Sequence, residues 1–294
     1  MKTANDPLWP RLADLLGSDP GSPIAMIGIP AHKTSISPTN AHSTPAAVRS
    51  ALEKYSTYSW SRSLDIGGIK IFNAPDVESP DYADGEERVK ASMLPLRDKT
   101  VIAIGGDNSI TYSVARGLWG ERIHQAGLVT VDAHHDLRDG ISNGSPVRRL
   151  LEAGLPGMNI AQIGIADFSN SAQYAQRARD HHITVIPRAS ISEFNIEEHV
   201  QQALTVAGRG GGPIHVDIDV DVCDRSIVPG CPAAAPGGIT AHQLRQMVFH
   251  LGADSRVSSI DFTEVDALAD STDGRTVRLV AVCIAEFLGG FSTR

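Results

Sequence analysis

Short runs of apolar and β-branched residues recur along the 294-residue chain, and longer stretches with a helical alternation of apolar and polar positions separate them. Most of the short runs are apolar on both faces. This pattern is typical of strands in a parallel sheet that helices cover on both sides. The runs that predict strands are residues 24–30, 100–106, 128–134, 159–165, 181–187, 213–222 and 257–265.

The intervening stretches predict helices. In residues 240–253, Leu244 and Met247 lie on one apolar face, and Thr240 precedes them as the expected N-cap. The closing segment 273–290 has the same spacing, and its terminal glycines are expected to end the helix. Helices are predicted for residues 44–56, 109–120, 169–182, 240–253 and 273–290.

Strands that alternate with helix-length segments imply right-handed crossovers and a mostly parallel sheet. We therefore expect an α/β fold in which helices cover both faces of the sheet. Residues 1–294 are expected to form a single domain, with an irregular N-terminal segment over about residues 1–22. In such sheets binding sites form at the carboxyl ends of the strands, so polar residues at those ends are the first candidates for chemistry.

Composition limits the classes of molecule that this protein is expected to bind. The formal net charge is -8 with acidic and basic residues mixed, which argues against a nucleic-acid surface and a polybasic membrane patch. A small ligand or another protein remains. No run of about 18 apolar residues occurs and residues 1–21 lack an apolar core, so we expect neither a membrane span nor a secretory signal. Three cysteines without a close pair argue against a disulfide framework or a thiolate zinc site, and predict a cytoplasmic protein.

The segment VDAHHDLRD, residues 131–139, follows one predicted strand and surrounds two histidines with acidic groups. Side chains alternate sides in an extended segment, so Asp132, His134 and Asp136 are expected to project together. His135 then faces away, where a structural or solvated role is expected.

Two further strand ends are acidic. In HVDIDVDVCD, residues 215–224, alternation sets Asp217, Asp219 and Asp221 on one face. His215 shares that face further upstream and is expected to be a hydrogen-bonded core histidine. A third strand segment, SIDFTEVD at 259–266, ends in Glu264 and Asp266.

If these strand ends converge, several carboxylates lie close together, and their mutual repulsion requires a compensating cation. Carboxylates with a single imidazole suit Mn²⁺ or Mg²⁺ better than a thiolate-type zinc site. Two ions that share carboxylates can activate a water, which predicts metal-assisted hydrolysis. Either acidic segment alone is as compatible with a solvated turn as with a metal site. The presence of both at strand ends favours the metal site.

Four segments resemble motifs of the arginase, agmatinase and formiminoglutamase family, the manganese ureohydrolases. The resemblance extends from about residue 24 to the C-terminus and implies the family's three-layer fold, two Mn²⁺ ions per chain and assembly into homo-oligomers. The segments are GGDNSIT at 105–111, VDAHHD at 131–136, DIDVDVCDRSIVPG at 217–230, and DFTEVDALAD at 261–270 with RTVRLVA at 275–281.

The resemblance also implies roles for individual residues. Asp136 would orient the attacking water, and Glu264 would hold the cationic nitrogen of the substrate. Counting back from Pro229 and Gly230 assigns Asp217 to a position that is usually serine. One ion would be held by Asn108, Asp132, Asp136 and Asp219, and the other by Asp132, His134, Asp219 and Asp221, with Asp132 and Asp219 bridging.

Three departures from the family pattern stand out. Asn108 replaces the commoner metal-binding histidine, and because an amide oxygen is a poorer donor than imidazole, the first ion is expected to be held loosely. Asn143 replaces an active-site histidine of arginases, which argues against an imidazole proton relay there. Arg225 replaces the proline that usually follows Asp224, and its role stays open.

The segments DLR, SNGSPVRR and GIADFSNSAQYAQRA resemble formiminoglutamases more than arginases. Arg138 and Arg148 offer planar forks for a substrate with two carboxylates, with Asn143 beside them. The alternative, a surface ion pair, is favoured more for Arg149 than for Arg138.

The expected reaction is hydrolysis of the linear amidine N-formimino-L-glutamate to L-glutamate and formamide, a step of histidine degradation. An agmatinase or a hydrolase of guanidino acids such as 4-guanidinobutanoate is the alternative within the same class. A non-catalytic relative is the alternative from another class. It is motivated by Asn108 and Asn143, although the retained carboxylates argue against it.

Overall fold

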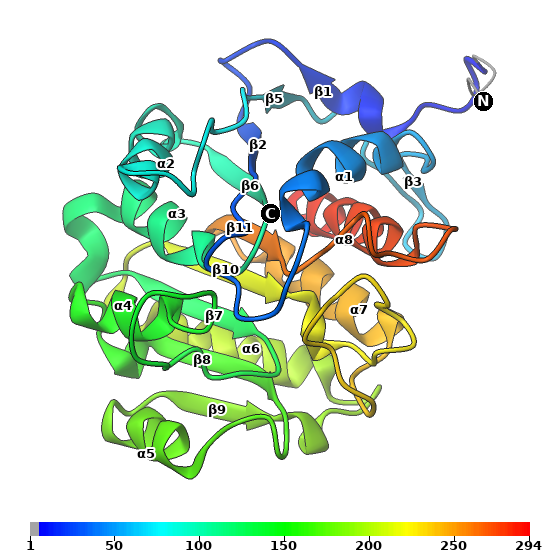
Figure 1. Ribbon diagram of the computed structural model, residues 1–294. Helices are drawn as coiled ribbons and strands as arrows, with labels where there is room; N and C mark the ends of the chain where they lie inside the picture. Colours follow the sequence, from blue (N-terminus) through cyan, green and yellow to red (C-terminus); the bar gives the residue numbers. More distant parts are fainter. Residues whose placement is uncertain (1–5) are drawn as a thin grey trace.

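A nine-stranded sheet forms the centre of the computed structural model, which describes residues 6–294. Its strands are β1 (Leu16–Gly17), β2 (Ile24–Ile29), β5 (Ile71–Asn73), β6 (Thr100–Gly105), β7 (Gly127–Val131), β8 (Ile160–Ile165), β9 (Thr184–Pro187), β10 (Ile214–Asp219) and β11 (Val257–Thr263). Their spatial order is β1-β5-β2-β6-β11-β10-β7-β8-β9, and neighbouring strands are parallel throughout (Figure 1). A separate antiparallel pair joins β3 (Tyr58–Ser59) to β4 (Leu64–Asp65).

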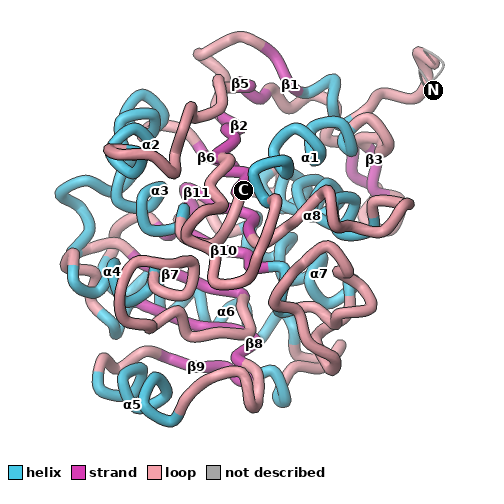
Figure 2. The backbone as a smooth tube through the Cα atoms, in the orientation of Figure 1, coloured by secondary structure: helices cyan, strands magenta, loops and turns pink. Residues whose placement is uncertain are grey.

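Helices cover both faces of this sheet (Figure 2). They are α1 (Thr44–Leu52), α2 (Gly85–Met93), α3 (Ile110–Trp119), α4 (Pro146–Glu152), α5 (Ala172–Asp180), α6 (Ile196–Ala207), α7 (Ala241–Ala253) and α8 (Arg275–Phe291). Alternate side chains of the strands enter different cores: Met26 and Ile102 pack with α1, α7 and α8, whereas Ile27 and Val101 pack with α2 and α3. The predicted three-layer α/β fold is therefore confirmed.

All seven predicted strands and all five predicted helices are present, and Thr240 caps α7 with a capping box through Gln243. Helices α2, α4 and α6 were not predicted. The N-terminal segment contains, in its described part, a 3-10 helix at Leu12–Leu15 and the two-residue strand β1. No helix within residues 6–294 combines the length and the apolar composition needed to cross a bilayer.

The end of α8 differs from the prediction. The helix continues to Phe291, so Gly289 and Gly290 lie inside it. A Cβ atom on Gly290 would lie 2.1 Å from the carbonyl oxygen of Phe249 in α7. Gly290 is thus needed for the close approach of two packed helices, and does not end α8.

Candidate metal centre

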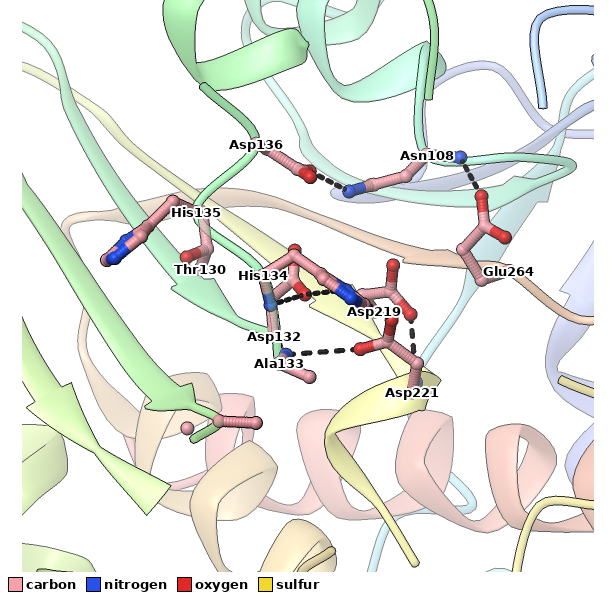
Figure 3. A network of polar contacts seen from close by, with 12 residues as sticks. Asn108, Thr130, Asp132, Ala133, His134, His135, Asp136, Asp219, Asp221 and Glu264 are labelled. Atoms are coloured by element: carbon pink, nitrogen blue, oxygen red, sulfur yellow. Dashed lines mark hydrogen bonds and ion pairs between the residues drawn. The ribbon is translucent and has the colours of Figure 1, made fainter. Parts of the chain in front are cut away.

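Four adjacent strands of the sheet, β6, β11, β10 and β7, bring acidic side chains and Asn108 to the same edge. Asn108 follows β6, residues 132–136 follow β7, Asp219 and Asp221 lie at the end of β10, and Glu264 follows β11 directly. Because all four strands are parallel, their carboxyl ends meet, as the sequence predicted. These side chains form one cluster (Figure 3).

The half of the cluster around His134 is closely bonded. His134 Nδ1 lies 2.7 Å from Asp221 Oδ2 and 3.6 Å from Asp132 Oδ1. The backbone amide of Ala133 donates to Asp221 Oδ1 at 3.1 Å, and the amide of Asp221 donates to Asp219 Oδ1 at 2.8 Å. One ligand atom from each of Asp132, His134 and Asp221 can be chosen so that all three lie within 4.8 Å of one another.

The half of the cluster around Asp136 has a different backbone from the one that strand alternation implies. Strand β7 ends at Val131, and Asp136 adopts a left-handed conformation with φ of 53°. Aspartate tolerates this region better than most residues because its short polar side chain can bond locally. The left-handed turn brings Asp136 Oδ2 to 2.5 Å from the Nδ2 of Asn108. Asp136 therefore joins the site as predicted, through a turn in place of an extended segment.

Asn108 presents its amide nitrogen to the carboxylates. Its Oδ1 accepts hydrogen bonds from the hydroxyls of Thr111 and Thr263, each at 3.0 Å. An amide nitrogen has no lone pair for a metal. A half-turn of the side-chain amide would exchange the two atoms and present Oδ1 to the cluster, because the nitrogen and the oxygen occupy nearly equivalent positions. The residue lies where the motif predicted, but its oxygen is turned away from the cluster.

The electrostatics of the cluster reflect crowded negative charge. Burial and then the charge of Asp221 raise the pKa of Asp132 to about 6. Burial and the charge of Asp132 raise the pKa of Asp136, and burial and the charge of Asp221 raise that of Asp219. Burial alone would lower the pKa of His134, but Asp221 and Asp132 raise it to about 12. One imidazolium cannot compensate all of these carboxylates.

Divalent cations fit this donor set. The Oδ2 of Asp132 is buried and lacks a hydrogen-bond partner within residues 6–294, although an unpaired buried carboxylate oxygen is costly. Carboxylate oxygens with one imidazole match the ligand preference of Mn²⁺ and Mg²⁺. Asp132, His134, Asp136, Asp219 and Asp221 are the residues that would hold them.

A cavity of about 250 Å³ opens beside the cluster, lined by His134, Asp136, Asp219, Asp221, Glu264, Arg138, Asn143 and residues that the sequence left unassigned. The carboxylate of Glu264 is buried, and its Oε1 accepts from the backbone amide of Asn108 at 2.8 Å and from Asn143 Nδ2 at 2.9 Å. Burial and the charge of Asp107 raise the pKa of Glu264 to about 8. Asn143 Oδ1 in turn accepts from the amide of Ile36 at 3.1 Å, which anchors it.

Three arginines of this region, Arg138, Arg148 and Arg149, differ in where their guanidinium groups lie and in what they contact. Arg138 lines the cavity and is exposed. Arg148 does not line it: its guanidinium bonds to the backbone carbonyls of Arg138 and Gly140 and pairs with Glu152. It therefore holds the loop that carries Arg138, and is not in place to touch a ligand in the cavity. Arg149 forms an ion pair with Glu86.

The remaining histidines of the motifs are structural. The ring of His135 points away from the cluster (Figure 3), and its Nδ1 lies 2.7 Å from the side chain of Gln162. His215 is completely buried and bonds to Ser259 and Asp261. The orientation of His135 agrees with strand alternation, and the buried, hydrogen-bonded His215 agrees with the core role expected from its place upstream of the acidic run.

Sequence reasoning missed part of the cavity wall. Ile36 and Ser37 come from the loop after β2, and residues 169–171 with Tyr174 come from the start of α5. The rule that sites form at strand carboxyl ends could have found these segments, since both follow predicted strands. Residues 169–171 and Tyr174 lie in the segment GIADFSNSAQYAQRA, whose resemblance was noted above, but none of these uncharged side chains was assigned a role.

Comparison with known proteins is consistent with this geometry. The sequence description of the Arginase family matches residues 22–289. Formimidoylglutamase of Halalkalibacterium halodurans is 35% identical over 276 residues, which cover 90% of this chain and 86% of that protein. The crystal structure of formimidoylglutamase from Bacillus subtilis has a TM-score of 0.90 at 29% identity, and covers 99% of this chain and 96% of its own. Trypanosoma cruzi formiminoglutamase, crystallised with Mn²⁺, shares the fold with a TM-score of 0.90 at 24% identity, covering 97% of this chain and 99% of its own. The chain belongs to the arginase family.

Proposed function

We propose that this protein hydrolyses N-formimino-L-glutamate to L-glutamate and formamide, using two manganese ions. One observation carries the proposal: a single cavity joins a carboxylate-rich metal centre, the buried carboxylate of Glu264 and the exposed guanidinium of Arg138. Its volume of about 250 Å³ is below the roughly 300–1,000 Å³ of sites for drug-sized ligands, which favours a small linear substrate.

The cationic amidine of the substrate matches Glu264. Two donors, the amide of Asn108 and the side chain of Asn143, hold Glu264 Oε1 in one position. A substrate amidinium beside this carboxylate would favour its ionised form, because a nearby positive charge lowers a carboxyl pKa. In this proposal Glu264 binds the substrate, and Asn143 positions Glu264.

The carboxylates of the substrate match the opposite wall. Unlike Arg148 and Arg149, Arg138 has no ion-pair partner among the described residues. The first residues of α5 also face the cavity, and a helix N-terminus favours negative charge. Agmatine lacks a carboxylate and would leave this wall without a counterion, which disfavours agmatinase activity.

The residues of the chain can then divide the chemical work. Two bound divalent ions would supply Lewis acidity and lower the pKa of a shared water. Asp136 lines the cavity beside the cluster, where its carboxylate can accept a proton from the attacking water and return it to the departing amine. The bond between the formimidoyl carbon and the glutamate nitrogen breaks, which releases L-glutamate, while the former water oxygen leaves in formamide.

The names of the relatives support the substrate, since the Halalkalibacterium and Bacillus proteins are formimidoylglutamases. We infer that the reaction belongs to histidine degradation, in the cytoplasm, where the three free cysteines would stay reduced. Assembly into homo-oligomers stays a prediction.

The test is a substrate panel of N-formimino-L-glutamate, 4-guanidinobutanoate and agmatine, assayed with added Mn²⁺. We expect a high rate of turnover with N-formimino-L-glutamate and not with the other two compounds. Arg138→Ala should raise KM for N-formimino-L-glutamate roughly 10- to 100-fold with a smaller change in kcat, since a charged hydrogen bond contributes about 1.5–3 kcal/mol. Arg149→Ala, which breaks a surface pair with Glu86, is the matched control. An unchanged KM in Arg138→Ala contradicts carboxylate recognition by this residue.

A further inference from the structure

A buried carboxylate below the cluster has no role in the reaction just described. Asp217 lies in the middle of β10, between Thr130 of β7 and Asp261 of β11 in the register of the sheet. Its side chain is completely buried, and neither carboxylate oxygen has a hydrogen-bond partner within residues 6–294. A bare carboxylate in such surroundings is strongly unfavourable, so it requires either a proton or a cation.

The carboxylate of Asp217 is directed at the cluster. One oxygen from each of Asp132, Asp136 and Asp217 can be chosen so that all three lie within 4.8 Å of one another. Oxygens that share one ion at about 2.0–2.6 Å are separated by no more than about 5 Å. The unpartnered Oδ2 of Asp132 belongs to the same group of residues. This spacing is compatible with a single divalent ion in contact with all three carboxylates.

The same region lacks an imidazole. Asn108 turns its Nδ2 to Asp136 and its Oδ1 to two threonine hydroxyls, and the only metal ligand that this side chain can offer is its neutral amide oxygen. Asp217 stands where the family motif usually has serine, a side chain without charge. Compared with the usual family motif, this chain thus has one imidazole fewer and one carboxylate more around the first metal position.

We propose that Asp217 is a ligand of the first metal ion, where it replaces the imidazole that Asn108 lacks and creates an all-oxygen site. This inference rests on the proposed function only in taking the centre to be binuclear. An all-oxygen site selects hard ions, so the first position should prefer Mn²⁺ or Mg²⁺ to Zn²⁺. The position beside His134 keeps its imidazole and should discriminate less.

A proton shared between Asp217 and Asp261 is the competing arrangement. Asp261 faces Asp217 across the two strands, and its Oδ2 lies 3.0 Å from the Nε2 of His215. If the two carboxyl groups only share a proton, removing Asp217 leaves metal binding unchanged. The arrangements are therefore separable by metal content alone, without an assay of turnover.

The experiment compares the wild type with Asp217→Ser, Asp217→Asn, Asn108→His and the double variant Asn108→His/Asp217→Ser. Manganese per chain is measured by elemental analysis, the two affinities by calorimetry, and coupling of the two ions by electron paramagnetic resonance. We expect Asp217→Ser to weaken the first ion roughly 100-fold or more, since loss of even an outer partner of a metal ligand costs 10- to 100-fold. The double variant, which restores the usual family pair, should regain two ions.

Asp217→Asn keeps the shape of the side chain and is therefore the control for a folding defect. Circular dichroism of each variant would reveal such a defect. Asp217→Asn should also weaken the first ion, because an amide is a poorer donor than a carboxylate. Two ions bound with unchanged affinity in a folded Asp217→Ser variant would overturn the proposal. A wild type that binds two ions but leaves N-formimino-L-glutamate intact would instead overturn the proposed function and leave this inference standing.

Discussion

Glu264 makes the stability of the metal-free protein depend on pH, and Glu264→Gln tests the size of this effect. Burial, followed by the charge of Asp107, raises the pKa of Glu264 from 4.5 to about 8. Glutamine retains an oxygen that can accept from Asn108 and Asn143, as Oε1 does now. The substitution therefore removes the ionisable group and keeps its two hydrogen bonds.

The direction in which stability changes with pH follows from the linkage between proton binding and folding. A carboxyl group whose pKa is higher in the folded than in the unfolded state binds its proton more tightly when folded, so stability is lost as pH rises between the two values. For Glu264 this window extends from 4.5 to about 8. One pH unit corresponds to about 1.4 kcal/mol, so the ionised side chain costs the metal-free protein about 4–5 kcal/mol at pH 8 and above. At pH 5 the cost is below about 1 kcal/mol.

The assay is urea unfolding of chelator-treated protein at pH 5 and pH 8, followed by circular dichroism and linear extrapolation. Metal-free Glu264→Gln should exceed the wild type by about 3–5 kcal/mol in unfolding free energy at pH 8, and by far less at pH 5. With saturating Mn²⁺ the difference should shrink, because the cations offset the charge. Glu193→Gln, at an exposed position, is the control. An equal difference between variant and wild type at both pH values would refute the reasoning.

Other substitutions test the metal centre and the packing. His134→Ala should reduce bound manganese from two ions per chain toward one in elemental analysis, because it removes the imidazole that lies 2.7 Å from Asp221; two tightly bound ions would contradict this. Gly290→Ala should lower the unfolding free energy by about 1–3 kcal/mol or more, since its Cβ would meet a carbonyl at 2.1 Å. Gly289→Ala, whose Cβ would lie 3.5 Å from the nearest atom, should instead be neutral or stabilising by up to about 1 kcal/mol, and equal losses in both would sink the packing argument. Thr240→Ala should cost about 1 kcal/mol in urea unfolding because the α7 cap is lost, and no loss would mean that the capping box contributes little.

The acidic segments show which features of the metal centre could be predicted from the sequence pattern. Alternation along β10 predicted that Asp219 shares one face with Asp217 and Asp221, and the parallel direction of the strands predicted that the ends of β10 and β7 lie at the same edge of the sheet. Both deductions use only the period of a strand and the geometry of parallel sheets. For Asp136 the predicted direction was right, although a left-handed turn produces it.

Arg148 shows where local reasoning ended. Its spacing from Arg138 in the chain suggested a second fork for the substrate, but its guanidinium is bonded to the loop carbonyls. A long flexible side chain can reach several partners, and only the path of the 137–144 loop decides among them. The sequence likewise could not assign Asp217, because the carboxylates with which it can share an ion, Asp132 and Asp136, belong to another strand end.

By itself the sequence determined the layered α/β architecture, the identity of the acidic and imidazole groups, and the edge of the sheet at which they gather. These properties follow from periodicities within single elements and from the parallel direction of the strands. Tertiary structure alone decided the orientation of the Asn108 amide, the approach of Asp217 to Asp132, and the contact between α7 and α8 at Gly290. Each depends on distances between segments far apart in the chain, which are set by packing and cross-strand register, and no local pattern records them.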